Sequence, residues 1–196
     1  MSIICKDNEI IIRNLENTSD DMNCILKWLN NKNVSDYYGD SRKYTLEEIQ
    51  NKYVKKIESN FETPCIIEYN NKPIGYIQYY IVDCEEYEIP KEVFEKIIES
   101  NEKAMALDLF IGEDEYRDKG LGTRTIKLLI NEIFNDKSVN AILIDPKTSN
   151  KRAIECYRKC GFKDICVIPN REEKDGIKYD NLIMKIENYN LKKVKK

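Results

Sequence analysis

The spacing of apolar residues along the chain predicts several amphipathic helices. Ser19 or Asp20 caps the first, and Thr45 opens the second through a capping box, Thr-Leu-Glu-Glu. Pro90 begins a short third helix, and a fourth follows a glycine-containing turn. Gly161 ends the last helix. Apolar residues recur every three to four positions in these segments: Met22, Ile25, Leu26, Leu29, Leu46, Ile49, Tyr53, Ile57, Val93, Phe94, Ile97, Ile98, Ile126, Leu129, Ile130, Ile133, Phe134.

Short apolar runs between these helices predict strands. Residues 63–69 and 74–82 flank the turn Asn-Asn-Lys-Pro, which indicates a hairpin. The nearly continuous apolar runs 105–111 and 139–145 are typical of strands buried on both faces. An opening strand and a closing pair, which is separated by the polar stretch 170–178, complete the set: 9–14, 163–169, 179–187.

The predicted order is β-α-α-β-β, an insertion, and then β-α-β-α-β-β. Strands that alternate with helices around one sheet predict a mixed α/β or α+β fold. The chain shows no internal repeat or linker, so residues 1–188 are expected to form a single domain, with 189–196 a basic, frayed tail. The insertion, 83–102, carries eight carboxylates against two lysines, a local charge of −6.

Composition narrows the class of protein. The net charge of −3 gives no basis for nucleic-acid binding, and no apolar run is long enough to cross a membrane. The chain starts without the pattern of a signal peptide, so we expect a cytoplasmic protein, monomeric or homodimeric. Seven cysteines, an odd number without a CxxC pair, argue against a disulfide framework and against a metal site. The absence of histidine excludes Ser-His-Asp and Cys-His catalysis, which leaves a carboxylate, another unusual group or water as a general base.

A glycine-containing loop is the strongest chemical signal. Arg117-Asp-Lys-Gly120-Leu-Gly122-Thr123 lies between a buried strand and an amphipathic helix. Its glycines let the backbone approach a ligand, and the free N–H groups at a helix start attract anions such as a pyrophosphate. A plain strand-to-helix turn is the alternative. The loop lacks the GK[ST] end of a P-loop and the third glycine of a dinucleotide fingerprint.

A second motif follows at 150–162, Asn-Lys-Arg-Ala-Ile-Glu-Cys-Tyr-Arg-Lys-Cys-Gly-Phe. As a helix, it places Ala153, Tyr157 and Cys160 on one side, where a core-facing tyrosine is the ordinary interpretation. Together, Arg-x-x-Gly-x-Gly and Asn-x-x-Ala-x-x-x-Tyr-x-x-x-Gly-Phe resemble the GNAT acetyltransferase family. The order and spacing of the two motifs together are more specific for this family than either motif alone.

The resemblance implies an α+β GNAT acyl-CoA N-acyltransferase fold, with a central mixed, mostly antiparallel sheet flanked by helices. It also implies acetyl-CoA as co-substrate and no metal. Asn150 would contact the pantetheine arm, and Tyr157 would be the general acid that protonates the departing thiolate. The residues expected to bind acetyl-CoA are Leu109, Phe110, Ile111, Arg117, Asp118, Lys119, Gly120, Leu121, Gly122, Thr123, Asn150, Ala153.

Between Asp36 and Phe162 the chain looks more specifically like the aminoglycoside 6′-N-acetyltransferases. The segments that carry this likeness are Tyr37-Tyr38-Gly39-Asp40, Pro73-Ile-Gly-Tyr-Ile-Gln-Tyr, Leu107-Asp108-Leu-Phe-Ile-Gly, and Ile144-Asp145-Pro146 with Ser149-Asn150. The subfamily often has Trp-Trp-Gly-Gly where this chain has Tyr-Tyr-Gly-Asp. The likeness implies Asp108 as catalytic base and a cationic aminoglycoside as substrate, in an enzyme of antibiotic resistance. The expected substrate-binding residues are Tyr38, Asp40, Tyr76, Tyr79, Glu85, Glu86, Asp108, Asp145.

The position of Asp108 is informative even without the family resemblance. By strand alternation it shares a face with Ala106 and Phe110, and a carboxylate on an apolar face is costly unless it is paired or used. We expect it to take the proton of the substrate ammonium, directly or through water. The family resemblance implies that a backbone N–H near Leu109–Ile111 stabilises the oxyanion. Tyr157 then returns a proton to sulfur, so transfer is direct within a ternary complex. A bulge that turns Asp108 to solvent is the alternative.

Rival interpretations remain at this stage. Each tyrosine named above could equally pack in the core or across strands, and each exposed carboxylate could be a solvated surface charge. The enzyme could acetylate another amine, such as a polyamine, an amino sugar or a protein N-terminus. A non-catalytic acyl-CoA-binding domain is the non-enzymatic alternative.

Overall fold

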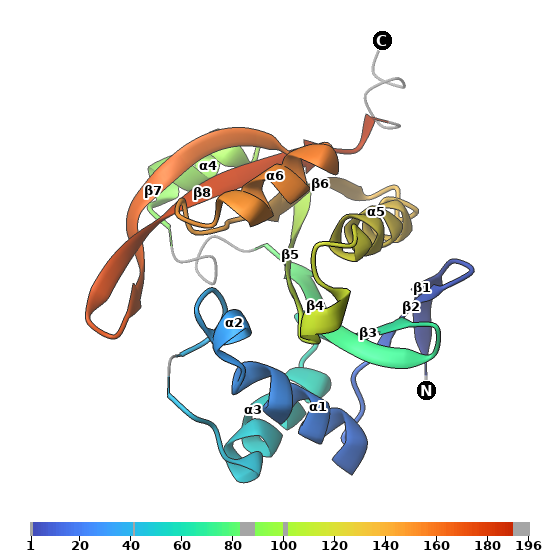
Figure 1. Cartoon of the computed structure of the whole chain (residues 1–196). Coiled ribbons are helices and arrows are strands. Elements are labelled where there is room, and N and C mark those ends of the chain that lie inside the picture. The colour runs from blue at the N-terminus through green and yellow to red at the C-terminus, as the bar shows by residue number, and fades with distance from the viewer. Residues whose placement is uncertain (1, 41, 83–88, 100–101, 190–196) are drawn as a thin grey trace. The chain divides into compact units, whose positions relative to one another are not determined.

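A computed structural model describes residues 2–40, 42–82, 89–99 and 102–189 of the chain (Figure 1). It contains two compact units, each built from two stretches of sequence. The first unit consists of Met1–Tyr79 and Asp108–Leu129, and the second of Tyr80–Leu107 and Ile130–Lys196. Because several elements run from one stretch into the next, strands β4 and β5 and helix α5 contribute residues to both units.

The first unit has strand order β1-β2-β3-β4-β5. β1 and β3 both pair antiparallel with β2, for example Lys6 with Ile11 and Ile12 with Ile67. The strands of this unit are β1 (Ile3–Lys6), β2 (Ile10–Asn14), β3 (Glu62–Tyr69), β4 (Lys72–Ile81) and β5 (Lys103–Ile111). Its helices are α1 (Ser19–Leu29), α2 (Lys32–Ser35), α3 (Leu46–Glu58), a 3-10 turn (Asp114–Tyr116) and α5 (Leu121–Ile133).

The second unit has strand order β4-β5-β6-β8-β7. β6 pairs parallel with β5, from Lys103–Val139 to Ala106–Leu143, and antiparallel with β8. The remaining elements are α4 (Lys91–Ile97), β6 (Val139–Ile144), α6 (Lys151–Lys159), β7 (Lys163–Lys174) and β8 (Ile177–Glu187). The parallel pair within otherwise antiparallel strands is the mixed sheet that the sequence predicted.

Helix caps follow the sequence signals with one correction. Thr18, not Ser19 or Asp20, caps α1, because its hydroxyl accepts a hydrogen bond from the Asp21 N–H at 3.3 Å. The capping box of α3 is confirmed, since Thr45 and Glu48 bond each other's backbone N–H groups. Both residues satisfy N–H groups that the first helical turn leaves without a partner.

The closing strand pair is longer than predicted. The polar stretch 170–178 was expected as a loop, but β7 continues to Lys174 and β8 begins at Ile177. The turn is only Asp175-Gly176, with φ of +52° and +74°, a sequence that favours a two-residue hairpin turn. Sequence analysis also missed β1 and the four-residue α2, which are too short to show a period.

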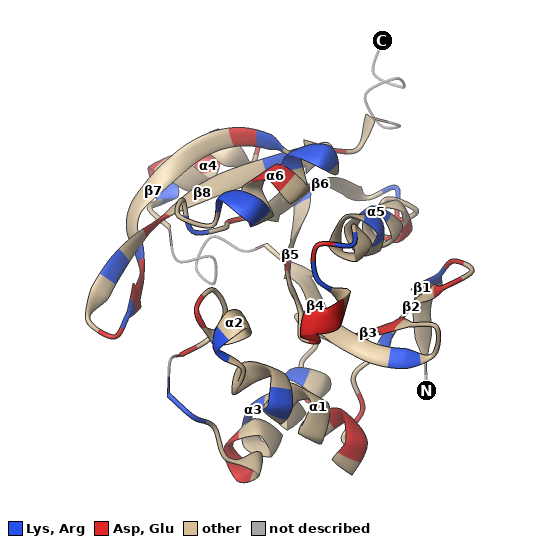
Figure 2. Cartoon of the chain, in the orientation of Figure 1, with Lys and Arg blue, Asp and Glu red and all other residues tan. Residues whose placement is uncertain are grey.

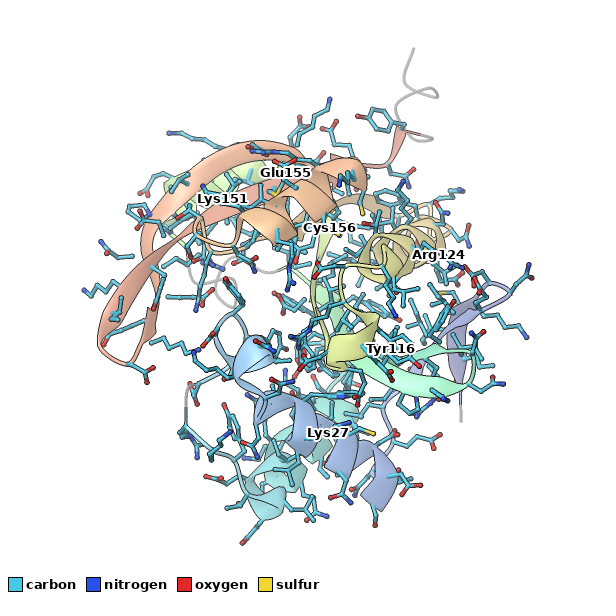
Figure 3. The ribbon with its side chains drawn as sticks, in the orientation of Figure 1. Lys27, Tyr116, Arg124, Lys151, Glu155 and Cys156 are labelled. Carbon is cyan, nitrogen blue, oxygen red and sulfur yellow. The ribbon has the colours of Figure 1, made fainter. Side chains whose placement is uncertain are left out.

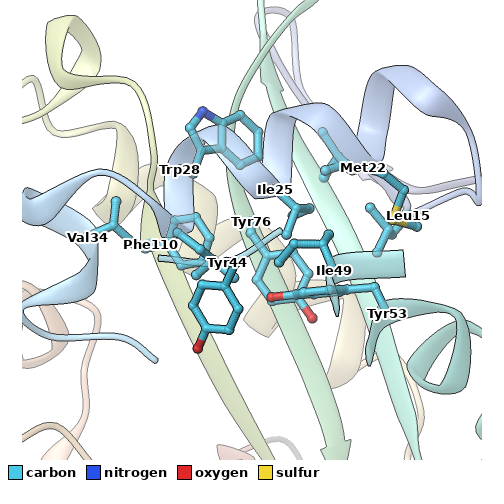
Figure 4. Close-up of a cluster of buried hydrophobic side chains, with 12 residues drawn as sticks. Leu15, Met22, Ile25, Trp28, Val34, Tyr44, Ile49, Tyr53, Tyr76 and Phe110 are labelled. Atoms are coloured by element: carbon cyan, nitrogen blue, oxygen red, sulfur yellow. The ribbon is translucent and has the colours of Figure 1, made fainter. Parts of the chain in front are cut away.

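The core of the first unit is rich in aromatic residues (Figure 4). Trp28 is fully buried and meets the Phe110 ring edge-to-face at 6.1 Å. Beneath α1, the buried Arg13 guanidinium binds Asp21 at 2.7 Å and Glu68 at 2.6 Å. Its hydrogen bonds to Asp21 are the main reason that the pKa of Arg13 is raised, although burial opposes this. This ion triad ties α1 to β2 and β3.

Two glycines permit close approaches beside β5. A Cβ on Gly75 of β4 would lie 2.4 Å from the Phe110 carbonyl oxygen. A Cβ on Gly112, just after β5, would lie 2.2 Å from Cγ of Trp28. Neither distance is tolerated between real atoms, so both glycines are required by packing.

Gly112→Ala is expected to destabilise the protein by about 1–3 kcal/mol, because the buried Trp28 ring must move to accommodate the new methyl group. Urea unfolding followed by tryptophan fluorescence measures this directly, since Trp28 is the chain's one tryptophan. Gly122→Ala is the matched control, because a Cβ there meets no atom within 4 Å. Equal stability of the two variants would contradict the packing argument.

Candidate active site

The loop that leaves β5 is tied back to the end of that strand by an arginine. The Arg117 Nε donates to the Ile111 carbonyl at 3.0 Å, and Nη1 binds Asp114 at 2.7 Å. Only 11% of the Arg117 side chain is exposed. The side chain of Arg117 therefore holds the shape of the loop.

The turn before α5 has the backbone of an anion cradle. Asp118 and Gly120 have φ of +58° and +76°, and α5 then begins at Leu121. The first N–H groups of a helix have no intrahelical acceptor and carry the positive end of its dipole. A Cβ on Gly122 would meet no protein atom within 4 Å, so packing within the chain does not require glycine there. The space beside Gly122, next to the first N–H groups of α5, could accommodate a phosphate group.

Two aromatic and two basic side chains make contacts around this loop, of which Figure 3 labels Tyr116 and Arg124. Tyr116 packs edge-to-face on Tyr69 at 5.8 Å, and Lys119 lies 5.7 Å above the Tyr116 ring. Arg124, on α5, binds Glu9 at 2.8 Å and Asp7 at 3.1 Å, which anchors the helix to the turn between β1 and β2. The loop and the start of α5 are thus held against β3 and the turn between β1 and β2.

Asp108 lies half-buried near the end of β5, between two buried neighbours on its face, Ala106 and Phe110. Its Oδ2 accepts a hydrogen bond from Nε2 of Gln78, on β4, at 2.8 Å. Gln78 is itself only 6% exposed. The carboxylate is therefore oriented by a buried partner that sequence analysis did not single out, although Gln78 lies within the quoted motif 73–79.

The tyrosines expected to line a substrate site differ in burial. Tyr76 is fully buried, stacked on Phe110 at 5.6 Å, and its pKa is raised well above the usual value by burial. This position favours the core-packing alternative for Tyr76. Tyr38 and Tyr79 are half-buried, and Tyr38 lies 4.8 Å from the Phe110 ring. These two retain surface that a ligand could contact.

The acidic residues expected near the substrate are already engaged where the structure describes them. Asp40 is largely exposed, accepts from the Tyr44 hydroxyl at 3.0 Å and lies 3.5 Å from Arg42. Glu85 and Glu86 lie outside the described residues. In Figure 2, acidic and basic residues alternate along the ribbon of both units.

Asp145, at the end of β6, pairs with an arginine that sequence analysis placed in a loop. Its Oδ2 lies 2.7 Å from Nε of Arg171 on β7, with 17% and 12% of the two side chains exposed. Beside this pair, Lys147 binds Glu172 at 3.1 Å, and Asn181 donates to Glu172 at 2.6 Å. Asp145 thus already has a cationic partner within the chain. Because β7 was predicted too short, this partner was missed.

Helix α6 presents the second motif. Asn150 caps it, since its Oδ1 accepts from the Ala153 N–H at 3.2 Å. Tyr157, 8% exposed, faces inward and packs edge-to-face on Phe162 at 6.1 Å. Gly161, with φ of +100°, ends the helix as predicted. Figure 3 labels Lys151, Glu155 and Cys156 on the same helix.

Two findings bear on other functions. Among the described residues, no three metal-ligating side chains gather into a possible metal site. None of the helices that the structure describes is both long and apolar enough to cross a membrane.

Residues 17–168 match the family model described as an acetyltransferase (GNAT) domain. The chain belongs to the GNAT acetyltransferase family. This confirms the predicted family, fold class and enzyme class.

Named relatives of this GNAT acetyltransferase include the aminoglycoside N(6′)-acetyltransferases type 1 of Klebsiella pneumoniae and Serratia marcescens. Each is 30% identical over 164 residues, which cover 83% of this chain and 78% of the relative. A solved structure of AAC(6′)-Ib with paromomycin and acetyl-CoA superposes with a TM-score of 0.75 at 24% identity, covering 96% of this chain and 99% of that one. A further AAC(6′)-Ib structure contains coenzyme A and kanamycin.

The Asn150 cap yields a test in this GNAT acetyltransferase. Asn150→Ala is expected to cost about 1 kcal/mol of stability, because the Ala153 N–H loses its acceptor. Asn150→Asp is expected to retain wild-type stability or exceed it, since a carboxylate also accepts this bond and suits a helix N-terminus. Urea midpoints measure both. Equal losses in the two variants would rule out the cap.

Proposed function

We propose that the chain is an acetyl-CoA-dependent aminoglycoside 6′-N-acetyltransferase that confers antibiotic resistance in the cytoplasm. The observation that carries this proposal is the 30% identity to named enzymes of that activity over 83% of the chain. The alignment is long enough to include both chemical motifs and the Asp108 strand. The cationic small molecule is the partner; a monomer or a homodimer would serve equally.

Acetyl-CoA supplies an activated acetyl group as a thioester. In the proposal, backbone N–H groups of the loop hold its pyrophosphate, and Asn150, with Ala153 on the next turn, meets the pantetheine arm. Asn150 Oδ1 is committed to the helix cap, so its amide Nδ2 is the group assigned to this contact. The proposed cofactor-binding residues are Leu109, Phe110, Ile111, Arg117, Asp118, Lys119, Gly120, Leu121, Gly122, Thr123, Asn150, Ala153.

Asp108 acts as the general base. An alkyl ammonium is mostly protonated at neutral pH, so the substrate nitrogen must lose a proton before it can attack. The half-buried Asp108 carboxylate accepts that proton. Backbone N–H groups of Leu109–Ile111 stabilise the negative charge that develops on the carbonyl oxygen, and the Tyr157 hydroxyl provides a proton to the leaving sulfur. The acetyl group therefore passes directly to the amine, without an acyl-enzyme.

Substrate recognition combines aromatic surface with carboxylates. Tyr38 and Tyr79 offer partly exposed rings, and Asp40 and Asp145 offer carboxylates. Since Arg171 already pairs with Asp145, a substrate ammonium must share or displace that arginine to use this carboxylate. Binding of a substrate ammonium at Asp145 thus competes with Arg171. Asp145 therefore attracts a polycation less strongly than a carboxylate without a cationic partner would.

The proposal is tested by mixing the protein with acetyl-CoA and kanamycin or tobramycin and weighing the product. One added acetyl group is expected, and its position at the 6′-amine is read by NMR. Absence of a product across several aminoglycosides with a 6′-amine would reject this substrate class. Polyamines, amino sugars and peptide N-termini tested with the same donor distinguish another amine as substrate.

Asp108→Asn and Tyr157→Phe are each expected to lower kcat/KM by about 10²-fold or more, because general acids and bases contribute on this scale. Asp20→Asn and Tyr189→Phe, at exposed positions, are the matched controls and should leave kcat/KM unchanged. A change of less than a few-fold in either site variant, with folding intact, would contradict the role assigned to it.

Gly122→Ala separates cofactor binding from stability. The substitution should leave stability unchanged or raise it slightly, because alanine favours helix and no atom lies within 4 Å of the new Cβ. It should weaken binding of coenzyme A about tenfold, since the methyl group then stands where the phosphates approach the N–H groups. Calorimetry measures binding. Unchanged affinity would place the pyrophosphate elsewhere.

A further inference from the structure

Gln78 links Asp108 to a cation within the first unit. Its Nε2 lies 2.8 Å from Asp108 Oδ2. Its Oε1 lies 2.6 Å from the Tyr76 hydroxyl and 3.1 Å from Nζ of Lys56, on α3. Lys56 also pairs with Glu62. A partly buried chain of polar contacts therefore runs from Glu62 through Lys56 and Gln78 to Asp108.

The partners of Gln78 determine which way its amide faces. A lysine ammonium can only donate, so the amide atom that faces Lys56 must be the oxygen. An ionised carboxylate can only accept, so the atom that faces Asp108 must be the nitrogen. A flipped amide would place two donors together at Lys56 and two acceptors together at Asp108. Gln78, 6% exposed, is thus locked with its N–H toward the carboxylate.

We propose that Gln78 is a positioning residue for acetyl transfer: by donating to Asp108 Oδ2, it fixes the orientation in which the carboxylate accepts the substrate proton. This inference rests on the proposed function and extends it. Gln78 itself neither gains nor loses a proton. The proton passes from the substrate ammonium nitrogen to the Asp108 carboxylate, the nitrogen retains the electron pair with which it attacks, and the Gln78 N–H stays on Oδ2 throughout.

The same bond favours the charged form of the Asp108 carboxyl group over the neutral form. A carboxylate that accepts an N–H bond is stabilised in its charged form, and the positive Lys56 behind the amide strengthens that donor. Gln78 also accepts from the Tyr76 hydroxyl and from Lys56, and Glu62 lies behind Lys56. Because burial raises the pKa of Tyr76, its hydroxyl stays protonated and donates over the whole working range of pH.

Gln78→Met tests the proposal, since methionine matches the length of glutamine but has no N–H donor. The expected result is a loss of about tenfold or more in kcat/KM, with an unchanged KM for acetyl-CoA. In a plot of kcat/KM against pH, the acid limb should move to higher pH. Gln78→Glu should move the limb further, because it puts a second carboxylate beside Asp108. Gln50→Met, at the chain's other glutamine, is exposed and serves as control.

A second readout does not need the substrate. Titration of the ¹³C-labelled Asp108 carboxyl in the protein alone should also move to higher pH in Gln78→Met. Lys56→Met covers the case in which Gln78→Met fails to fold, and should shift the titration in the same direction, with the exposed Lys55→Met as control. If no aminoglycoside is acetylated but the titration shifts, the substrate class fails and the role of Gln78 stands. A folded Gln78→Met or Lys56→Met with the wild-type titration would overturn the proposal.

Discussion

The close approach of β4 to β5 at Gly75 is the constraint on which the proposed catalytic face depends. The absence of a side chain there brings the backbone of β4 against the Phe110 carbonyl. With the strands this close, the next residue, Tyr76, stacks on the Phe110 ring. Two positions further along β4, on the same face as Tyr76, Gln78 reaches Asp108. Glycine at position 75 thus affects both the packing of β4 against β5 and the orientation of Asp108.

Some groups near the candidate site hold the local structure, and others are proposed to bind the ligand. In some places the two roles fall on different atoms of one side chain. Arg117 gives its guanidinium to the loop, so that backbone N–H groups are left for the anion. Asn150 gives its amide oxygen to the helix cap and retains its nitrogen for another partner. Asp145 instead carries a resident cation, Arg171, and is the site at which this chain's substrate preference should depart most from a simple acidic receptor.

Much of this organisation could be predicted from sequence. The glycine-containing loop, the capping motif and the strand periodicity are local signals, and they placed Asp108, Asn150 and Tyr157 on the elements where the structure has them. Gly122, which was expected in the loop, lies instead in the first turn of α5. The contacts between distant segments could not be predicted. Gln78 meets Asp108 across thirty positions, and Arg171 meets Asp145 across twenty-six. Such pairs depend on strand register and hairpin length, and the hairpin was predicted too short because its strands are polar.

The most direct measurement is a crystal structure with coenzyme A and an aminoglycoside bound together. The account predicts the 6′-nitrogen within hydrogen-bond distance of the Asp108 carboxylate, directly or through one water, while Gln78 remains on Oδ2. It also predicts phosphate oxygens on the N–H groups at the start of α5. An aminoglycoside seated with its 6′-nitrogen away from Asp108, beside some other base, would contradict the account.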